Sequence, residues 1–137
     1  MKPVVIRTLT VLILALSVLV TACSSDTTTQ SIELVSPAEA AQVIADDPAG
    51  LVVLDIRTPE EFAQARLADA VLVDFYEADF AAQLDTLDKD VPYVMYCNSG
   101  NRSSEAVKTM KDLGFVEVYE IDGGIVNWYD QGYPIGS

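Results

Sequence analysis

The chain has 137 residues, half of them apolar, and its 8 basic and 21 acidic residues give a net charge of −13. This length suits one small domain with a single core. The acidic balance excludes a nucleic-acid binder, which needs clustered lysine and arginine. The sequence has no histidine, which excludes Ser-His-Asp and Cys-His catalysis and argues against a typical zinc site.

Residues 1–22 have the pattern of an export signal. Lys2 and Arg7 supply a positive start, and residues 8–22 are almost unbroken apolar sequence, too short for a comfortable membrane span. The segment ends in Val20-Thr21-Ala22-Cys23, which resembles the lipobox of bacterial lipoproteins. The resemblance implies that Cys23 is lipidated and that the protein is exported, anchored to a bacterial membrane and facing the periplasm or the cell exterior. The alternative is an ordinary secretory signal cleaved near Ala22.

Residues 23–31 are polar and short-chained, and we interpret them as a flexible tether to one domain, residues 32–137. Apolar runs predict strands at residues 32–35, 51–54, 71–73, 91–96 and 116–121. Helices are expected to begin at Ser36-Pro37-Ala38-Glu39 and at Thr58-Pro59-Glu60-Glu61, and to span residues 77–87, 103–113 and 125–130. Apolar strands that alternate with helices predict an α/β fold, with a central, mostly parallel five-stranded sheet covered by helices on both faces.

Ligand sites in such sheets lie beyond the carboxyl ends of the strands. Three segments are expected at that edge: Asp55, Cys97 and the turn Asp122-Gly123-Gly124. The most informative of them is Cys97-Asn98-Ser99-Gly100-Asn101-Arg102-Ser103, a thiol followed by a tight polar loop and a helix start. Backbone N–H groups, the positive end of the helix and a guanidinium favour an anion there, and they lower the pKa of the Cys97 thiol. With Cys23 lipidated, Cys97 has no disulfide partner.

Four segments, taken in order, carry a family resemblance over nearly all of residues 32–137. They are Asp55-Ile56-Arg57-Thr58-Pro59-Glu60-Glu61-Phe62, Cys97 to Ser103, Gly123-Gly124-Ile125-Val126-Asn127-Trp128, and Gly132-Tyr133-Pro134-Ile135. Together they resemble the rhodanese-like sulfurtransferases. The resemblance implies a rhodanese-like three-layer fold and a thiosulfate or persulfide sulfurtransferase without cofactor or metal. Sulfur would pass to a thiophilic acceptor, which is cyanide, a small thiol or a protein.

The resemblance also implies roles for residues. Cys97 would take the outer sulfur of an anionic donor and become a persulfide, as in nucleophilic catalysis. The loop residues Asn98, Ser99, Gly100, Asn101 and Ser103 would cradle that sulfur through backbone amides, since Gly100 allows the required backbone angles. Arg102 would bind the donor and stabilise developing charge. The supporting residues would be Asp55, Arg57, Gly123 and Gly124.

Two other functions stay open from the sequence. A non-enzymatic persulfide carrier or interaction module has the same fold. Related phosphatases use a loop one residue longer than the six residues from Cys97 to Arg102, which makes room for phosphate. The chain departs from the family at Ala65-Arg66-Leu67-Ala68-Asp69-Ala70, where the expected glycines and histidine are missing. Asp69 tolerates a left-handed turn better than most residues, so the departure concerns local geometry.

Overall fold

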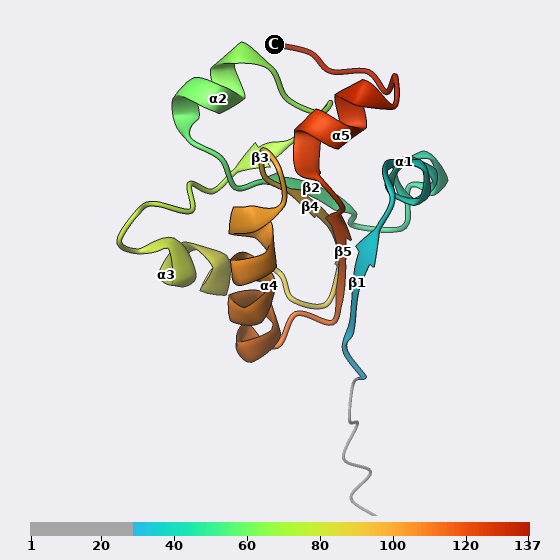
Figure 1. Ribbon diagram of the computed structural model, residues 1–137. Coiled ribbons are helices and arrows are strands. Elements are labelled where there is room, and N and C mark those ends of the chain that lie inside the picture. The colour runs from blue at the N-terminus through green and yellow to red at the C-terminus, as the bar shows by residue number, and fades with distance from the viewer. Residues whose placement is uncertain (1–28) are drawn as a thin grey trace, which may run out of the picture.

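The structure, a computed structural model, describes residues 29–137. The expected signal segment and Cys23 lie outside the described residues. One five-stranded sheet has the strand order β1-β5-β4-β2-β3, and every pair of neighbouring strands is parallel (Figure 1). The strands are β1 (Ser31–Val35), β2 (Val52–Asp55), β3 (Val71–Leu72), β4 (Pro92–Tyr96) and β5 (Glu117–Ile121). The predicted α/β fold is confirmed, and the sheet is parallel throughout.

Helices cover both faces of this sheet, as Figure 1 shows. The helices are α1 (Pro37–Asp46), α2 (Pro59–Gln64), α3 (Phe80–Asp85), α4 (Asn101–Leu113) and α5 (Gly124–Asp130). One core cluster joins α3 and α4 to the sheet, and a second joins α1 and α5 to its other face. Within residues 29–137, no helix is long and apolar enough to cross a membrane.

Both expected helix starts at serine or threonine form capping boxes. The Ser36 hydroxyl accepts a hydrogen bond from the Glu39 amide, and the Glu39 carboxylate accepts one from the Ser36 amide. Thr58 and Glu61 repeat this pattern at the start of α2. Each pair satisfies backbone donors that the first helical turn leaves free, and a proline follows each cap at the first helical position.

The segment expected as a helix over residues 77–87 is helical only in α3, from Phe80 to Asp85. Before α3, the amides of Glu77 and Phe80 bond to carbonyls three residues back, at Asp74 and Glu77. After α3, Thr86 and Leu87 do the same. Tight turns therefore replace helix at both ends, and the expectation was too long. Phe80 and Leu84 nevertheless face the core.

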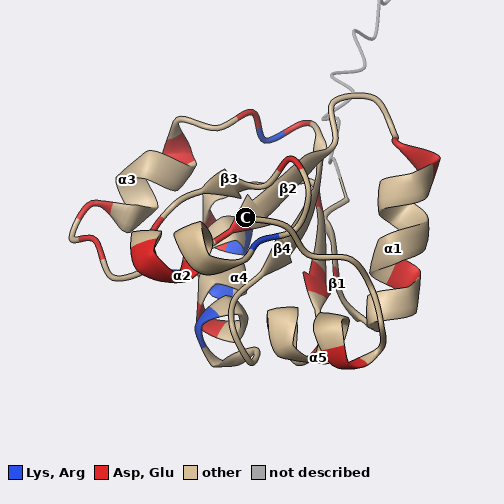
Figure 2. Ribbon diagram, turned by 90° about the horizontal axis from the view of Figure 1, so that it is seen from above, with Lys and Arg blue, Asp and Glu red and all other residues tan. Residues whose placement is uncertain are grey.

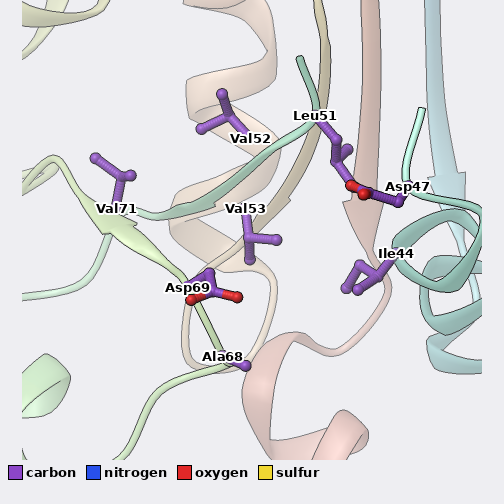
Figure 3. Close-up of a pocket in the computed structure, with 8 residues that line it drawn as sticks. All are labelled: Ile44, Asp47, Leu51, Val52, Val53, Ala68, Asp69 and Val71. Atoms are coloured by element: carbon purple, nitrogen blue, oxygen red, sulfur yellow. The ribbon is translucent and has the colours of Figure 1, made fainter. Parts of the chain in front are cut away.

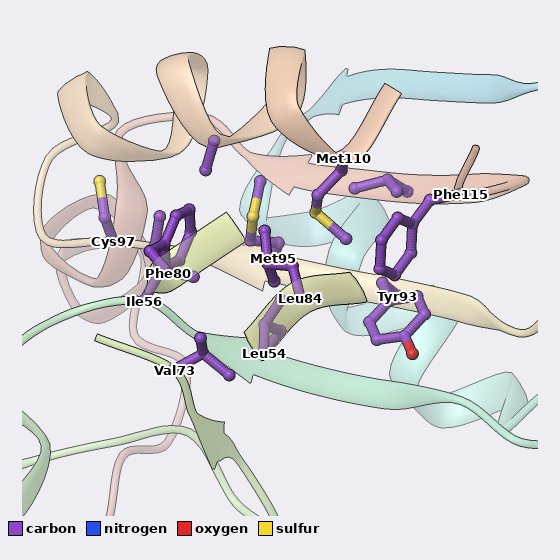
Figure 4. Close-up of a cluster of buried hydrophobic side chains, with 12 residues drawn as sticks. Leu54, Ile56, Val73, Phe80, Leu84, Tyr93, Met95, Cys97, Met110 and Phe115 are labelled. Atoms are coloured by element: carbon purple, nitrogen blue, oxygen red, sulfur yellow. The ribbon is translucent and has the colours of Figure 1, made fainter. Parts of the chain in front are cut away.

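The core cluster under α3 and α4 contains Leu54, Met95 and Met110, all fully buried, and it extends to Cys97 (Figure 4). Figure 4 shows Cys97 at one end of the cluster, where β4 passes into the loop before α4. This packing fixes the end of β4, so it also fixes where the thiol lies. Only 1% of Cys97 is exposed to solvent.

Candidate active site at Cys97

The backbone of the Cys97 loop turns toward its own sulfur. Gly100 precedes α4 with φ +101°, a left-handed conformation that favours glycine. In this conformation the Gly100 N–H donates a hydrogen bond to Cys97 Sγ at 3.1 Å. No side chain caps the N-terminus of α4, a helix of 13 residues. The sulfur therefore lies beside uncapped backbone N–H groups at the positive end of the helix dipole. The side chains of Asn98, Ser99 and Asn101 point to solvent and are exposed.

Two opposing effects act on the Cys97 thiol. Burial raises its pKa, because the thiolate loses hydration. The hydrogen bond with the Ser103 hydroxyl and those from the amides of Ser103, Gly100 and Ser99 outweigh burial, and the net pKa is lowered. The loop therefore favours the nucleophilic thiolate, as the sequence predicts. The amides that act on the sulfur are fewer than the whole run from Asn98 to Ser103.

The start of α5 holds the other side of the loop. The Ile125 amide donates to the Cys97 carbonyl at 2.9 Å, and the Val126 amide donates to the Asn98 carbonyl at 3.1 Å. Gly124, just before Ile125, lies against both of these carbonyls. A Cβ on it would be 2.5 Å from the Cys97 carbonyl oxygen and 2.6 Å from that of Asn98. Only glycine fits this close approach. The expected meeting of the Gly123-Gly124 turn with the cysteine loop is therefore present in the fold.

Arg102 lies beside the loop, but its guanidinium already has an anionic partner. Its two terminal nitrogens donate to the two carboxylate oxygens of Glu61 at 2.8 and 2.7 Å. The exposed ring of Tyr76 lies beneath the guanidinium, 5.4 Å away. The hydrogen bonds from Arg102 hold the pKa of Glu61 at about 2, although burial opposes them. Sequence reasoning missed this pair, and donor binding by Arg102 stays a prediction.

A second acidic residue lies behind the thiol, and it too was missed. Glu120 on β5 is 6% exposed, and its carboxylate accepts a hydrogen bond of 2.6 Å from the Ser103 hydroxyl. The Ser103 oxygen in turn accepts from the Cys97 thiol at 3.5 Å. Three buried side chains from the loop, α4 and β5 are thus linked in a row. The one sequence signal was a glutamate between Tyr119 and Ile121, in a strand that also begins with Glu117.

Asp55 and Arg57, expected as supporting residues, form a buried ion pair with a distance of 2.7 Å. Arg57 also donates to the Ala65 carbonyl, and its guanidinium lies over the Tyr96 ring. The Tyr96 hydroxyl accepts from the Leu67 amide at 3.1 Å. The pair therefore ties the ends of β2 and β4 to residues 65–67, and none of its hydrogen bonds reaches Cys97.

The segment that departs from the family pattern is held in two ways. Asp69 has φ +57°, the left-handed turn expected of it. Arg66 and Gly136 exchange two backbone hydrogen bonds of 2.8 Å in an antiparallel bridge. The closing segment of the chain thus takes part in shaping the turn, which the sequence did not indicate.

One cavity of about 380 Å³ lies away from the thiol, between α1, β2 and β3 (Figure 3). Its walls are mostly apolar, and Asp47 and Asp69 are the two acidic residues among those that line it. None of the residues that line it belongs to the Cys97 loop. Among residues 29–137, no three or more histidine, cysteine or acidic side chains gather in a way that could hold a metal ion.

The Rhodanese-like domain family matches residues 36–131, so the chain belongs to this family. A thiosulfate sulfurtransferase GlpE from Pseudomonas syringae is 38% identical over 93 residues, which are 67% of this chain and 83% of that protein. A sulfurtransferase from Allochromatium vinosum is 34% identical over 89 residues, 65% of this chain and 81% of that protein. The crystal structure of a rhodanese-related protein from Thermoplasma volcanium is similar with a TM-score of 0.66 and 27% identity, covering 76% of this chain and 97% of that one.

Proposed function

We propose that the protein is a sulfurtransferase that moves a sulfane sulfur from thiosulfate or a persulfide donor to a thiophilic acceptor through a Cys97 persulfide. The observation that carries this proposal is the Gly100 N–H at 3.1 Å from Cys97 Sγ, at the start of α4. Together with the Ser103 hydroxyl and the amides of Ser103 and Ser99, this N–H lowers the pKa of the thiol against the effect of burial, without histidine, which the chain lacks. Membership of the rhodanese-like family and the names of the two sulfurtransferase relatives support it.

The chemistry proceeds in two half-reactions. The Cys97 thiolate attacks the outer sulfur of thiosulfate; a new S–S bond forms on Cys97, and the S–S bond of thiosulfate breaks as sulfite leaves with the electron pair. An acceptor such as cyanide then attacks the outer sulfur of the persulfide, forming thiocyanate, and the Cys97 thiolate leaves. The Gly100 amide supports the charge on sulfur in each step.

The test is the intact mass of the protein after thiosulfate exposure, together with thiocyanate formation once cyanide is added. We expect a mass gain of one sulfur atom, lost again with cyanide. Cys97→Ser should show neither, because a hydroxyl is far less nucleophilic. Failure of the unaltered protein to gain sulfur from thiosulfate or from a small-molecule persulfide would overturn the proposal. An aryl phosphate assayed in parallel tests the phosphatase alternative.

The second candidate is a persulfide carrier that receives sulfur only from a protein. The Glu61–Arg102 ion pair favours it, because the one guanidinium beside Tyr76 is already neutralised. Figure 2 shows acidic segments on α1, α2 and α3 and few basic ones, a distribution that repels a dianion such as thiosulfate. Sulfur loading from a protein persulfide without loading from thiosulfate would favour the carrier.

The site of action belongs to the same proposal. Cys23 would carry the lipid that anchors the exported domain to a membrane, through a tether over residues 23–31. The lipobox pattern of residues 20–23 supports this. Metabolic labelling with an alkyne fatty acid, followed by membrane fractionation, tests it. We expect a labelled membrane protein, and an unlabelled one for Cys23→Ala; equal labelling of both would contradict lipidation at Cys23.

A further inference from the structure

The Glu120 carboxylate is a buried acid that the sulfur-transfer chemistry leaves unused. It lies on β5, on the face covered by α4, and is 6% exposed. None of the ion pairs among the described residues includes it. A buried carboxylate is costly unless it is hydrogen-bonded, and the Glu120 carboxylate accepts a hydrogen bond of 2.6 Å from the Ser103 hydroxyl. Ser103 itself is fully buried.

The Ser103 hydroxyl connects this carboxylate to the nucleophile. Its oxygen lies 3.5 Å from Cys97 Sγ, 2.6 Å from Glu120 Oε1 and 3.1 Å from the Gly100 carbonyl oxygen. A hydroxyl has one proton and two lone pairs, so it can accept from one neighbour while it donates to another. When the thiol is protonated, Ser103 accepts from Cys97 and donates to Glu120. When the thiolate forms, Ser103 donates to sulfur and must accept from the carboxyl group.

We infer that Cys97 and Glu120 share one proton through Ser103, so that Glu120 takes up the thiol proton when the nucleophile forms. The Cys97 S–H bond breaks and its proton passes to Ser103 Oγ, while the Ser103 hydroxyl proton passes to Glu120 Oε1. The net charge of the row is unchanged. When the persulfide gives up its outer sulfur, the same steps in reverse protonate the Cys97 thiolate. Glu120 is therefore a positioning residue and not a catalytic one, because it acts on the thiol only through Ser103.

The surroundings of Glu120 suit a group that holds a proton. Its neighbours on β1 and β4 are Leu34 and Met95, both apolar. Burial raises the pKa of Glu120, and the Ser103 hydrogen bond opposes this rise. The negative charge of Asp122, which follows β5, raises the pKa of Glu120 further. The Cys97 thiol, by contrast, has a lowered pKa. These opposite shifts bring the proton affinities of Cys97 and Glu120 closer together, which is the condition for sharing a proton.

The inference rests on the proposed role of Cys97, but its test needs no sulfur donor. The rate of Cys97 alkylation by iodoacetamide is measured from about pH 4 to about pH 10, an interval that covers the titration of carboxyl groups and of cysteine. Two groups that share a proton titrate in two steps, so the unaltered protein should react in two steps. In Glu120→Gln, whose neutral amide stands in for the protonated carboxyl group, the two steps should merge into a single step at lower pH, and the rate at a pH between the two original steps should rise.

Asp122→Asn is the matched control, because it removes a neighbouring charge without touching Ser103. It should keep both steps. A Glu120→Gln profile that superimposes on that of the unaltered protein, or a single step in the unaltered protein, would overturn proton sharing. A single step in the unaltered protein that moves to lower pH in Glu120→Gln would mean that Glu120 acts as a repelling charge alone.

Should Glu120→Gln fail to fold, the reciprocal measurement decides. The Glu120 carboxyl carbon is followed by ¹³C NMR against pH in the unaltered protein and in Cys97→Ser. We expect two steps with the thiol present and one without it. Identical titration curves in both proteins would overturn the inference. Loss of sulfur transfer with intact two-step titration would instead count against the proposed function alone.

Discussion

Gly124 lies against the Cys97 carbonyl so closely that a Cβ at this position would be 2.5 Å from the oxygen. The carbonyl is held there by the Ile125 amide, the next residue of α5. The cysteine loop and the Gly-Gly turn are therefore one structural unit, although 27 positions separate these two residues, from 97 to 124. Their contact sets which way the loop turns its carbonyls and its amides.

Gly124→Ala should therefore disrupt the site more than the fold around it. The methyl group meets backbone oxygens, and φ +62° adds strain of about 1–3 kcal/mol. We expect the free energy of unfolding to fall by at least that amount and sulfur transfer to fall about tenfold or more. Gly132→Ala is the control, because φ is +84° there but no atom lies within 4 Å. Equal losses in both variants, measured by urea unfolding and thiocyanate formation, would contradict the role of the close contact.

Glu61→Gln should release the Arg102 guanidinium for an anionic donor. Glutamine can still serve in the capping box of α2, so the helix start is kept. For a partly exposed ion pair worth about 1 kcal/mol or less, we expect the KM for thiosulfate to fall by up to about fivefold. Glu60→Gln removes the same charge from an exposed neighbour and should leave KM nearly unchanged. A KM that rises or stays constant in Glu61→Gln would argue against donor binding by Arg102.

The same ion pair should make the free energy of unfolding depend on pH. The folded pKa of Glu61, about 2, lies below its ordinary value of 4.5, so the contribution is present above 4.5 and is lost as pH falls toward 2. Because Glu61 is 29% exposed, we expect no more than about 1 kcal/mol. The difference in unfolding free energy between the unaltered protein and Glu61→Gln should shrink between pH 6 and pH 3, roughly the window of this linkage. A difference that is constant with pH would contradict the linkage.

Asp55→Asn should destabilise the fold strongly. The change leaves the Arg57 guanidinium, 4% exposed, without its carboxylate, and an unpaired buried charge costs about 3–5 kcal/mol. Asp85→Asn is the matched control, since Asp85 is 61% exposed and its pairing with Lys89 contributes little. Urea unfolding measures both. A small effect at Asp55 would show that the ion pair does not hold residues 65–67 in place.

The strands and the cysteine loop were predictable because their signals are local. Five buried apolar residues of β4, followed by polar turn residues with Gly100 before a helix, encode the loop in adjacent positions. The left-handed turn at Asp69 was also confirmed, since it depends on the residue itself. The extent of α3 was not predictable in the same way. Asp74 accepts from the Tyr76 amide and starts a turn that competes with the helix.

The partners of charged residues in the site could not be predicted. Arg102 pairs with Glu61, 41 positions away, and Ser103 bonds to Glu120, 17 positions away. Each choice depends on how α2 and β5 are placed beside α4, which no local pattern contains. Among 21 acidic residues, sequence spacing alone favours helical neighbours such as Glu105, which in the structure pairs with Lys108.

The backbone that surrounds Cys97 is held by amides and carbonyls of α4 and α5, while the side chains of Asn98, Ser99 and Asn101 face solvent. These three positions can therefore be randomised together in a saturation library without loosening the scaffold. Selection of such a library on different sulfur compounds would let donor preference be engineered independently of folding.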